Sequence, residues 1–115
     1  MPFIRIETNT EYPVGKSEKI LEETSALVAK GVSKPVEYVM AKIAPAAPMA
    51  FGGKNVPTIY MEIKSVGLTT TQAKVLAKTL TDFAVENFTV PKDNVYIEFA
   101  NAQASFWGSG GDLLG

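Results

Sequence analysis

The sequence contains neither cysteine nor histidine among its 115 residues. It therefore cannot form disulfides, present a thiol nucleophile, ligate a metal through thiolate or imidazole, or build a catalytic triad that needs an imidazole base. Any chemistry must come from carboxylates, amines, phenols, hydroxyls or the chain terminus.

Runs of like charge and long apolar segments are also missing. Eleven basic and twelve acidic residues leave a formal net charge of -1, and no run of one sign is long enough to bind a phosphate backbone. No segment approaches the roughly 20 apolar residues of a membrane span, and the N-terminus lacks a basic region followed by an apolar stretch. We therefore expect no nucleic-acid partner, no membrane insertion and a cytoplasmic location.

The chain is built from two similar halves. The segment Pro2–Glu7 aligns with Pro57–Glu62, with Pro, Ile and Glu identical, and both segments read as short strands opened by a proline. This internal similarity and the length of the chain predict one domain over residues 1–115, with pseudo-repeats 2–43 and 57–99.

Each half continues with a helix and a second strand. Apolar residues at three- and four-residue spacings predict helices over 20–31 and 73–88, with Ser17 as the N-cap of the first and Thr69, in a capping box with Gln72, opening the second. A proline ends each helix, because it cannot extend helical hydrogen bonding. The strand-like runs that follow the two prolines cover 37–43 and 94–99.

Two tandem β-α-β units predict an α/β fold. Helical crossovers join parallel strands, so each half contributes a parallel pair to one four-stranded sheet. Each helix has a single apolar face, which places both helices on the same side of the sheet. The strands carry apolar residues at positions of both parities, a pattern typical of strands buried on both faces, so we expect neighbouring subunits to cover the other side.

Without imidazole or thiol, the N-terminus becomes a candidate catalytic group. Pro2 follows the initiator methionine, and a small second residue permits removal of Met1, which exposes a secondary amine. An α-amino group titrates near about 7.7–8.0, so burial and a nearby cation readily make it a neutral base. Lys34 is the candidate cation. The structural alternatives are that Pro2 only opens a strand and that Lys34 only stabilises a helix C-terminus.

Five segments together resemble the macrophage migration inhibitory factor (MIF) family, a tautomerase group. The most specific is Met-Ala-Phe-Gly-Gly, within Pro48–Gly53, because neither helix periodicity nor turn chemistry requires it. The resemblance implies a homotrimer whose sheets form a barrel-like core, with active sites between subunits and no cofactor. The matching segments are Met1–Ile4, Lys34-Pro35, Pro48–Gly53, Ser65–Gly67 and Val95–Ile97.

The resemblance also implies roles for individual residues. Pro2 acts as base and acid in keto-enol tautomerisation of aromatic α-keto acids such as phenylpyruvate, while Lys34 binds the substrate carboxylate. Besides Lys34, the implied substrate-binding residues are the backbone of Ser65 and Val66, Tyr96 and Glu98 from the strand near the C-terminus, and an apolar wall of Phe106 and Trp107. Tyr96 is expected to reach the pocket from the adjacent subunit. From sequence alone, Tyr96 and Trp107 also fit packed core or interface aromatics.

The chain departs from the family pattern at several positions. Glu98 stands where the family often has asparagine, and a carboxylate there would repel an anionic substrate or raise the pKa of the amine. Lys64 offers a compensating charge, but strand alternation puts its side chain on the opposite face from Ser65. The Cys-x-x-Cys pair of vertebrate members is absent, which excludes thiol oxidoreductase activity. The alternative functions are a receptor-binding, cytokine-like protein released without a signal peptide, with vestigial activity, and an inactive trimeric scaffold.

Overall fold

The computed structural model describes residues 1–12 and 15–115. A strand-helix-strand unit occurs twice, as β1 (Pro2–Thr8), α1 (Ser17–Val32) and β2 (Met40–Ile43), then β3 (Ile59–Val66), α2 (Thr70–Phe88) and β4 (Val95–Ala102). The 3-10 turns η1 (Val36–Tyr38), η2 (Lys92–Asn94) and η3 (Ala104–Phe106) precede β2, β4 and a hairpin of β5 (Gly108–Ser109) and β6 (Asp112–Leu113). Within the described ranges, no helix combines the length and apolar character needed to cross a bilayer.

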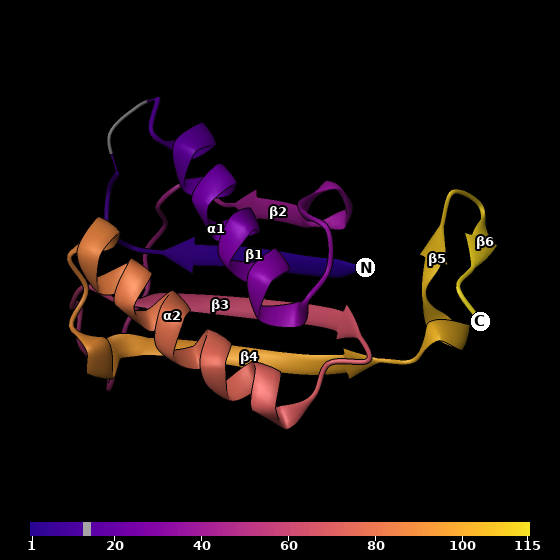
Figure 1. Cartoon of the computed structure of the whole chain (residues 1–115). Helices are drawn as coiled ribbons and strands as arrows, with labels where there is room; N and C mark the ends of the chain where they lie inside the picture. Colours follow the sequence, from indigo (N-terminus) through magenta and orange to yellow (C-terminus); the bar gives the residue numbers. More distant parts are fainter. Residues whose placement is uncertain (13–14) are drawn as a thin grey trace.

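The four long strands form one mixed sheet in the order β2-β1-β3-β4. Each half contributes a parallel pair, β1 with β2 and β3 with β4, and the halves meet where β1 runs antiparallel to β3. Helices α1 and α2 pack beside each other over one sheet face, and the C-terminal hairpin projects beyond the sheet end at which β1 begins (Figure 1). The predicted α/β class and one-sided helix layer are confirmed.

The core lies between the helices and the sheet face that they cover. Alternate side chains of β1 and β3 point to this face, as the period of two in a strand requires, and burying each such side chain contributes about 1.5–3 kcal/mol. The predicted helix periodicity supplies the opposing layer. Residues of this core with no solvent exposure include Ile4, Ile6, Met61, Ile63, Val28, Leu76 and Leu80.

The helix starts confirm one prediction and correct another. The capping box of α2 is present, because the Gln72 backbone N–H donates to Thr69 Oγ1 (3.1 Å) and the Thr69 N–H donates to Gln72 Oε1 (3.0 Å). Ser17 as an N-cap is wrong. It is already the first helical residue, since the carbonyl of Lys16 accepts the first helical hydrogen bond from Ile20 (2.9 Å).

The segment after each helix is more tightly wound than the sequence predicts. Ser33 and Thr89 take left-handed conformations with φ of 55° and 54°, and a proline follows two residues later in both halves. After Pro35, the Tyr38 N–H donates to the proline carbonyl (3.1 Å), which closes η1. The strand predicted over 37–43 therefore begins only at Met40, and in the second half β4 likewise follows a 3-10 turn.

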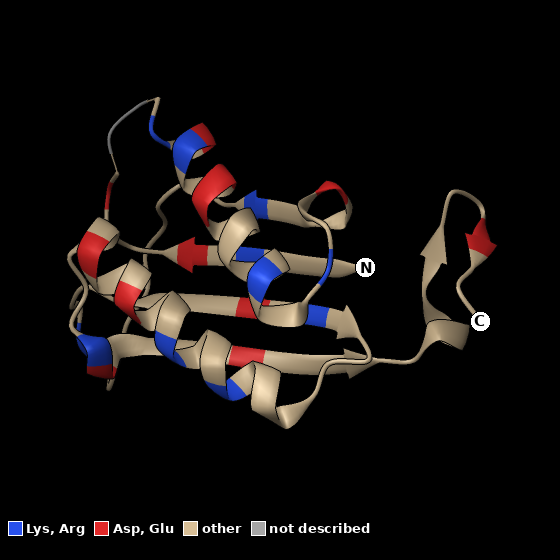
Figure 2. Ribbon diagram, viewed as in Figure 1, with Lys and Arg blue, Asp and Glu red and all other residues tan. Residues whose placement is uncertain are grey.

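The sheet face opposite the helices is polar at its centre. Arg5, Glu62 and Glu98 lie in one row across β1, β3 and β4, because the strand register places them side by side. The expectation that apolar residues fill both faces is wrong for this row, since the isoleucines of these strands point to the helices. Acidic and basic residues are interspersed over strands and helices (Figure 2), in keeping with the small net charge.

The Gly52-Gly53 pair forms a two-residue turn between Phe51 and Lys54. These flanking residues exchange two backbone hydrogen bonds, of 2.9 and 3.1 Å, and both glycines have positive φ, 60° and 75°. Such a turn favours glycine because a Cβ is strained at positive φ. Turn chemistry therefore does require this part of the Met-Ala-Phe-Gly-Gly segment, which corrects the expectation drawn from the sequence.

We expect Gly53→Ala to lower the free energy of unfolding by about 1 kcal/mol, the usual cost of a left-handed alanine. A Cβ at Gly53 meets no atom within 4 Å, so the cost is conformational rather than steric. Thermal or urea unfolding measures the change. Gly108→Ala is the matched control, because its φ lies outside the positive range and its Cβ would make an ordinary 3.8 Å contact. Equal stability of both variants would contradict the prediction.

Candidate active site

The start of β1 brings Pro2 and Lys34 together. Pro2 is fully buried and pairs with Ser65 at the end of β3. The Lys34 ammonium donates to Ser65 Oγ at 3.3 Å and to the Val66 carbonyl at 2.6 Å. Four residues singled out in the sequence thus lie at one end of the sheet, with the ammonium beside the N-terminal strand.

The path of the chain after α1 puts Lys34 in this place. Ser33 ends the helix in a left-handed conformation, and the Lys34 backbone N–H then donates to the Ala29 carbonyl at 3.0 Å. The equivalent residue in the second half, between Thr89 and its proline, is Val90, which is only 1% exposed and belongs to the core. The backbone therefore directs this side chain inward, and in the first half it carries a charge to the end of the sheet.

The surroundings of the N-terminal amine lower its pKa. With Met1 present, burial lowers the pKa of its amino group from 8.0 to about 6, and a hydrogen bond and charge repulsion from Lys34 act in the same direction. The amine is therefore mostly neutral at physiological pH. A neutral amine next to a fixed cation has the properties of a general base placed beside an anion-binding group.

A cavity of about 560 Å³ opens at this end of the sheet. Its walls come from the first residues of β1, from η1 and the start of β2, from Lys64 on β3, and from residues 107–110 at and within the first strand and turn of the C-terminal hairpin. The volume suits a small organic ligand. The lining residues are Met1, Pro2, Phe3, Glu37, Tyr38, Met40, Lys64, Trp107, Gly108, Ser109 and Gly110.

Sequence reasoning missed Tyr38 and Met40, which line this cavity. They escaped notice because each looks like an ordinary strand residue in an apolar run. A topological signal was nevertheless available: β1 and β2 are parallel, so both begin at the same sheet edge, and Met40 pairs with Phe3. Residues at the start of the second strand are therefore neighbours of the N-terminus.

The family model for macrophage migration inhibitory factor (MIF) matches residues 1–115. The chain belongs to the MIF family. A MIF homolog of Brugia malayi is 32% identical over 120 residues, covering 100% of both sequences. The crystal structure of a MIF homologue from Prochlorococcus marinus aligns with a TM-score of 0.91 at 31% identity, covering 98% of this chain and 99% of that one. MIF from Toxoplasma gondii aligns with a TM-score of 0.89 at 25% identity, covering 96% and 98%.

Membership of the MIF family supports a tautomerase or cytokine-like function in general. Of the other predicted site residues, Trp107 lines the cavity, whereas Phe106 is 83% exposed and is not among the lining residues. Tyr96 lies toward the start of β4, away from Pro2, and packs edge-on against Phe51 with ring centroids 5.1 Å apart. Within one chain of this MIF-family protein, Tyr96 therefore does not meet Pro2.

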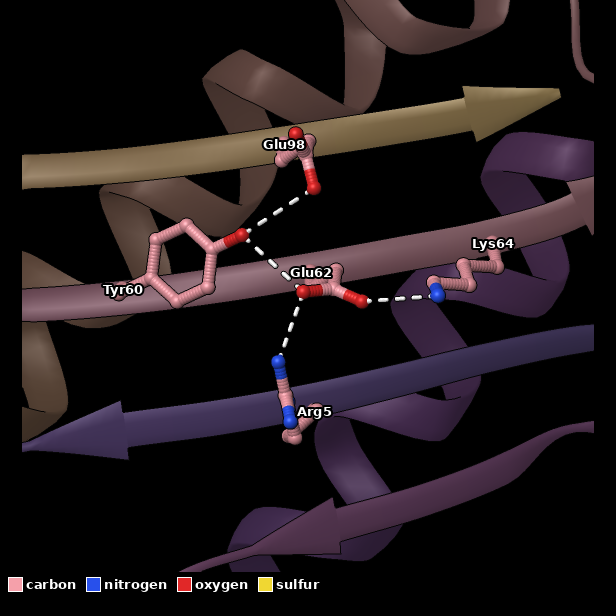
Figure 3. A network of polar contacts seen from close by, with 5 residues as sticks. All are labelled: Arg5, Tyr60, Glu62, Lys64 and Glu98. Carbon is pink, nitrogen blue, oxygen red and sulfur yellow. Dashed lines mark hydrogen bonds and ion pairs between the residues drawn. The ribbon is translucent and has the colours of Figure 1, made fainter.

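Glu98 belongs to a polar network on the open sheet face (Figure 3). The Tyr60 hydroxyl lies 3.1 Å from Glu62 Oε2 and 3.3 Å from Glu98 Oε1, so its single proton is shared between the two carboxylates. Glu62 also pairs with Arg5 (2.8 Å) and Lys64 (3.2 Å). Burial and the two carboxylates raise the pKa of Tyr60 to about 12, so its hydroxyl stays protonated and separates the two acids.

The network makes a pH-dependent contribution to the stability of the fold. The hydrogen bond from Lys64, with those from Tyr60 and Arg5, lowers the pKa of Glu62 although burial opposes this. A carboxyl with a lowered folded-state pKa stabilises the fold above its ordinary pKa of 4.5 and loses that contribution as the pH falls.

We expect Glu62→Gln to destabilise the protein most near neutral pH, with the difference from wild type shrinking in acid. Urea unfolding at several pH values measures it, and Lys78→Gln, which breaks an exposed pair with Asp82, serves as the control. A difference in free energy of unfolding between wild type and Glu62→Gln that stays the same at every pH measured would contradict this pH-dependent role of Glu62.

Among the described residues, no cluster of three or more acidic side chains is arranged to hold a metal ion.

Proposed function

We propose that this protein is a keto-enol tautomerase of aromatic α-keto acids of the phenylpyruvate type, with the Pro2 nitrogen as general base and acid after removal of Met1. The observation that carries the proposal is the Lys34 ammonium, fixed on Ser65 and Val66 beside an N-terminal amine whose pKa is lowered to about 6. No cofactor is part of the proposed reaction.

Removal of Met1 turns the Pro2 nitrogen from an amide into a secondary amine at the same end of β1. The two influences that lower the Met1 pKa also act on this nitrogen. Pro2 is fully buried, and its strand partner Ser65 accepts a hydrogen bond from Lys34. We therefore infer that burial and the Lys34 charge lower the pKa of the Pro2 amine relative to that of an exposed N-terminal proline.

The proposed reaction moves one proton and leaves the sum of atoms unchanged. Lys34 binds the substrate carboxylate and so holds the carbon next to the keto group against Pro2. The neutral nitrogen takes a proton from that carbon, and the electron pair shifts to the carbonyl oxygen. The ammonium so formed returns the proton to this oxygen and gives the enol.

We further propose that the active unit is a homotrimer, in which Tyr96 and Glu98 of one subunit approach the cavity of the next. Large apolar side chains on the surface of the single chain support assembly, since such patches mark interaction sites. They include Tyr96 at 62% exposure, Phe106 at 83% and Leu113 at 57%. Light scattering is expected to give three times the 12.4 kDa chain mass, and a monomer that turns over substrate would contradict this arrangement.

The test of the proposed function is turnover of phenylpyruvate by the purified protein. Mass spectrometry first establishes that Met1 has been removed, and the keto-enol ratio is then followed by absorbance or by exchange of the substrate's carbon-bound protons with deuterium. We expect catalysed conversion without added metal or cofactor. A processed, trimeric protein that leaves the uncatalysed rate unchanged would overturn the assignment and favour a binding role.

A further inference from the structure

Lys64 lines the cavity in which the proposed reaction takes place, but it has no role in that reaction as described above. It lies at the end of β3, one residue before Ser65, and its strand partner is Phe3. Because neighbouring strand residues point to opposite faces, Lys64 reaches the cavity from the open face while Lys34 approaches Ser65 from the helix side. Two ammonium groups therefore flank the first residues of β1.

The Lys64 ammonium is held in place by Glu62. Glu62 Oε1 lies 3.2 Å from Lys64 Nζ, while Oε2 is taken by Arg5 and by the Tyr60 hydroxyl (Figure 3). Glu62 is nearly buried, with 12% of its side chain exposed, whereas Lys64 keeps 49%. The carboxylate thus orients one N–H of an ammonium that has three, and in the single chain half of the lysine side chain remains exposed on the side of the cavity.

The charges around this position favour an anionic ligand. Glu62 is shared between two cations, Arg5 and Lys64, so it neutralises neither completely. Glu98 is bonded to Tyr60 rather than to Lys64. Among the described residues of one chain, the carboxylate that lines the cavity is Glu37, which is exposed on η1. Within one chain, Lys34 and Lys64 therefore place two positive groups at this end of the sheet against one carboxylate, and Glu98 of the next subunit, which the proposed trimer brings to the cavity, accepts a hydrogen bond from its own Tyr60.

We propose that Lys64 is a specificity-determining residue that binds a second anionic group of the substrate, so that the site takes keto acids with two carboxylates in preference to those with one. This rests on the proposed function, in which Lys34 binds the first carboxylate next to the reacting carbon. Phe3 and Trp107, on the same cavity, contact the apolar part between the two carboxylates.

The decisive experiment compares two substrates, phenylpyruvate and a phenylpyruvate with a carboxylate on the ring. We expect wild type to prefer the dianion, and Lys64→Gln to reduce the ratio of the two kcat/KM values about fivefold, mainly through KM. Fivefold corresponds to about 1 kcal/mol, the upper end of the range for an exposed ion pair. Lys64→Arg keeps the charge and is expected to restore the preference. Lys42→Gln, on the same sheet face outside the cavity, should leave the ratio unchanged.

A binding measurement separates failure of this inference from failure of the proposed function. Trp107 is the sole tryptophan and lines the cavity, so its fluorescence reports occupancy by the unreactive phenylacetate and by its ring-carboxylated analogue. Tighter binding of the dianion that is lost in Lys64→Gln supports the inference even if no substrate is turned over. If Lys64→Gln weakens the binding of both ligands equally, or changes the binding of neither, the inference that Lys64 binds a second carboxylate is overturned.

Discussion

Pro2→Gly is expected to lower phenylpyruvate turnover by about 10²- to 10⁴-fold, the contribution of a positioned general acid-base group. Glycine still leaves an N-terminal amine after Met1 is removed, but that amine is primary, lacks the rigid ring and loses the burial that the proline side chain provides. Its nitrogen is therefore more hydrated and more mobile. The measurement is kcat/KM at neutral pH, with mass spectrometry confirming that the variant is processed.

A second variant keeps Pro2 and blocks only its nitrogen. Retaining a residue before Pro2 leaves the nitrogen as an amide, which has no free electron pair for proton transfer, while the strand pairing of Pro2 with Ser65 is already present with Met1 in place. We expect this extended chain to assemble normally and to be inactive. Comparable turnover by the processed chain and by the extended chain would show that another group is the base.

Lys34→Met is the second change with a large expected effect. Methionine has similar length but no charge, so the variant loses the group proposed to hold the substrate carboxylate. We expect KM for phenylpyruvate to rise about tenfold to 100-fold, in the range expected when a charged hydrogen-bond partner is removed from a partly buried site. Lys30→Met, an exposed lysine in the last turn of α1, is the control.

Lys34→Met is also expected to change how kcat/KM depends on pH. The base is active when neutral, so kcat/KM rises with pH through the pKa of the free amine and then levels off. Burial and then Lys34 lower the pKa of the Met1 amine from 8.0 to about 6, and under the proposed function both act on the Pro2 amine in the same direction. Removal of the cation should move the rising limb to higher pH, toward the ordinary value. An unmoved limb would show that burial alone sets the pKa.

The sequence was sufficient to predict the arrangement of the fold, because its signals are local. Prolines mark the ends of the helices, a period of three to four residues marks their faces, and the crossover rule then fixes parallel pairs. The pairing of the two halves through antiparallel β1 and β3 follows from no local pattern. It is nevertheless this pairing that brings Ser65 opposite Pro2 and so creates the site.

Individual residues show where sequence reasoning failed. The polar row across Arg5, Glu62 and Glu98 could not be foreseen, because the alternation in each strand shows which residues share a face but not which residues of other strands they meet. Tyr38 was overlooked because it lies in η1, a short turn closed by hydrogen bonds to the carbonyls of Pro35 and Val36, which no periodicity encodes. The glycine turn was missed although a Gly-Gly pair is itself a signal for a two-residue turn, and the positive φ of both glycines shows why that pair stands there.

Lys34 and Val90 occupy equivalent positions in the two halves, and only Val90 contributes to the hydrophobic core. The same sequence of turns leads one half to a buried valine that strengthens the core and the other to a lysine at the end of the sheet. An apolar residue at position 34 is thus the choice that the scaffold alone would favour. The second half serves as an internal reference with a buried apolar residue at this position. Under the proposed function, the lysine of the first half exchanges packing for reactivity.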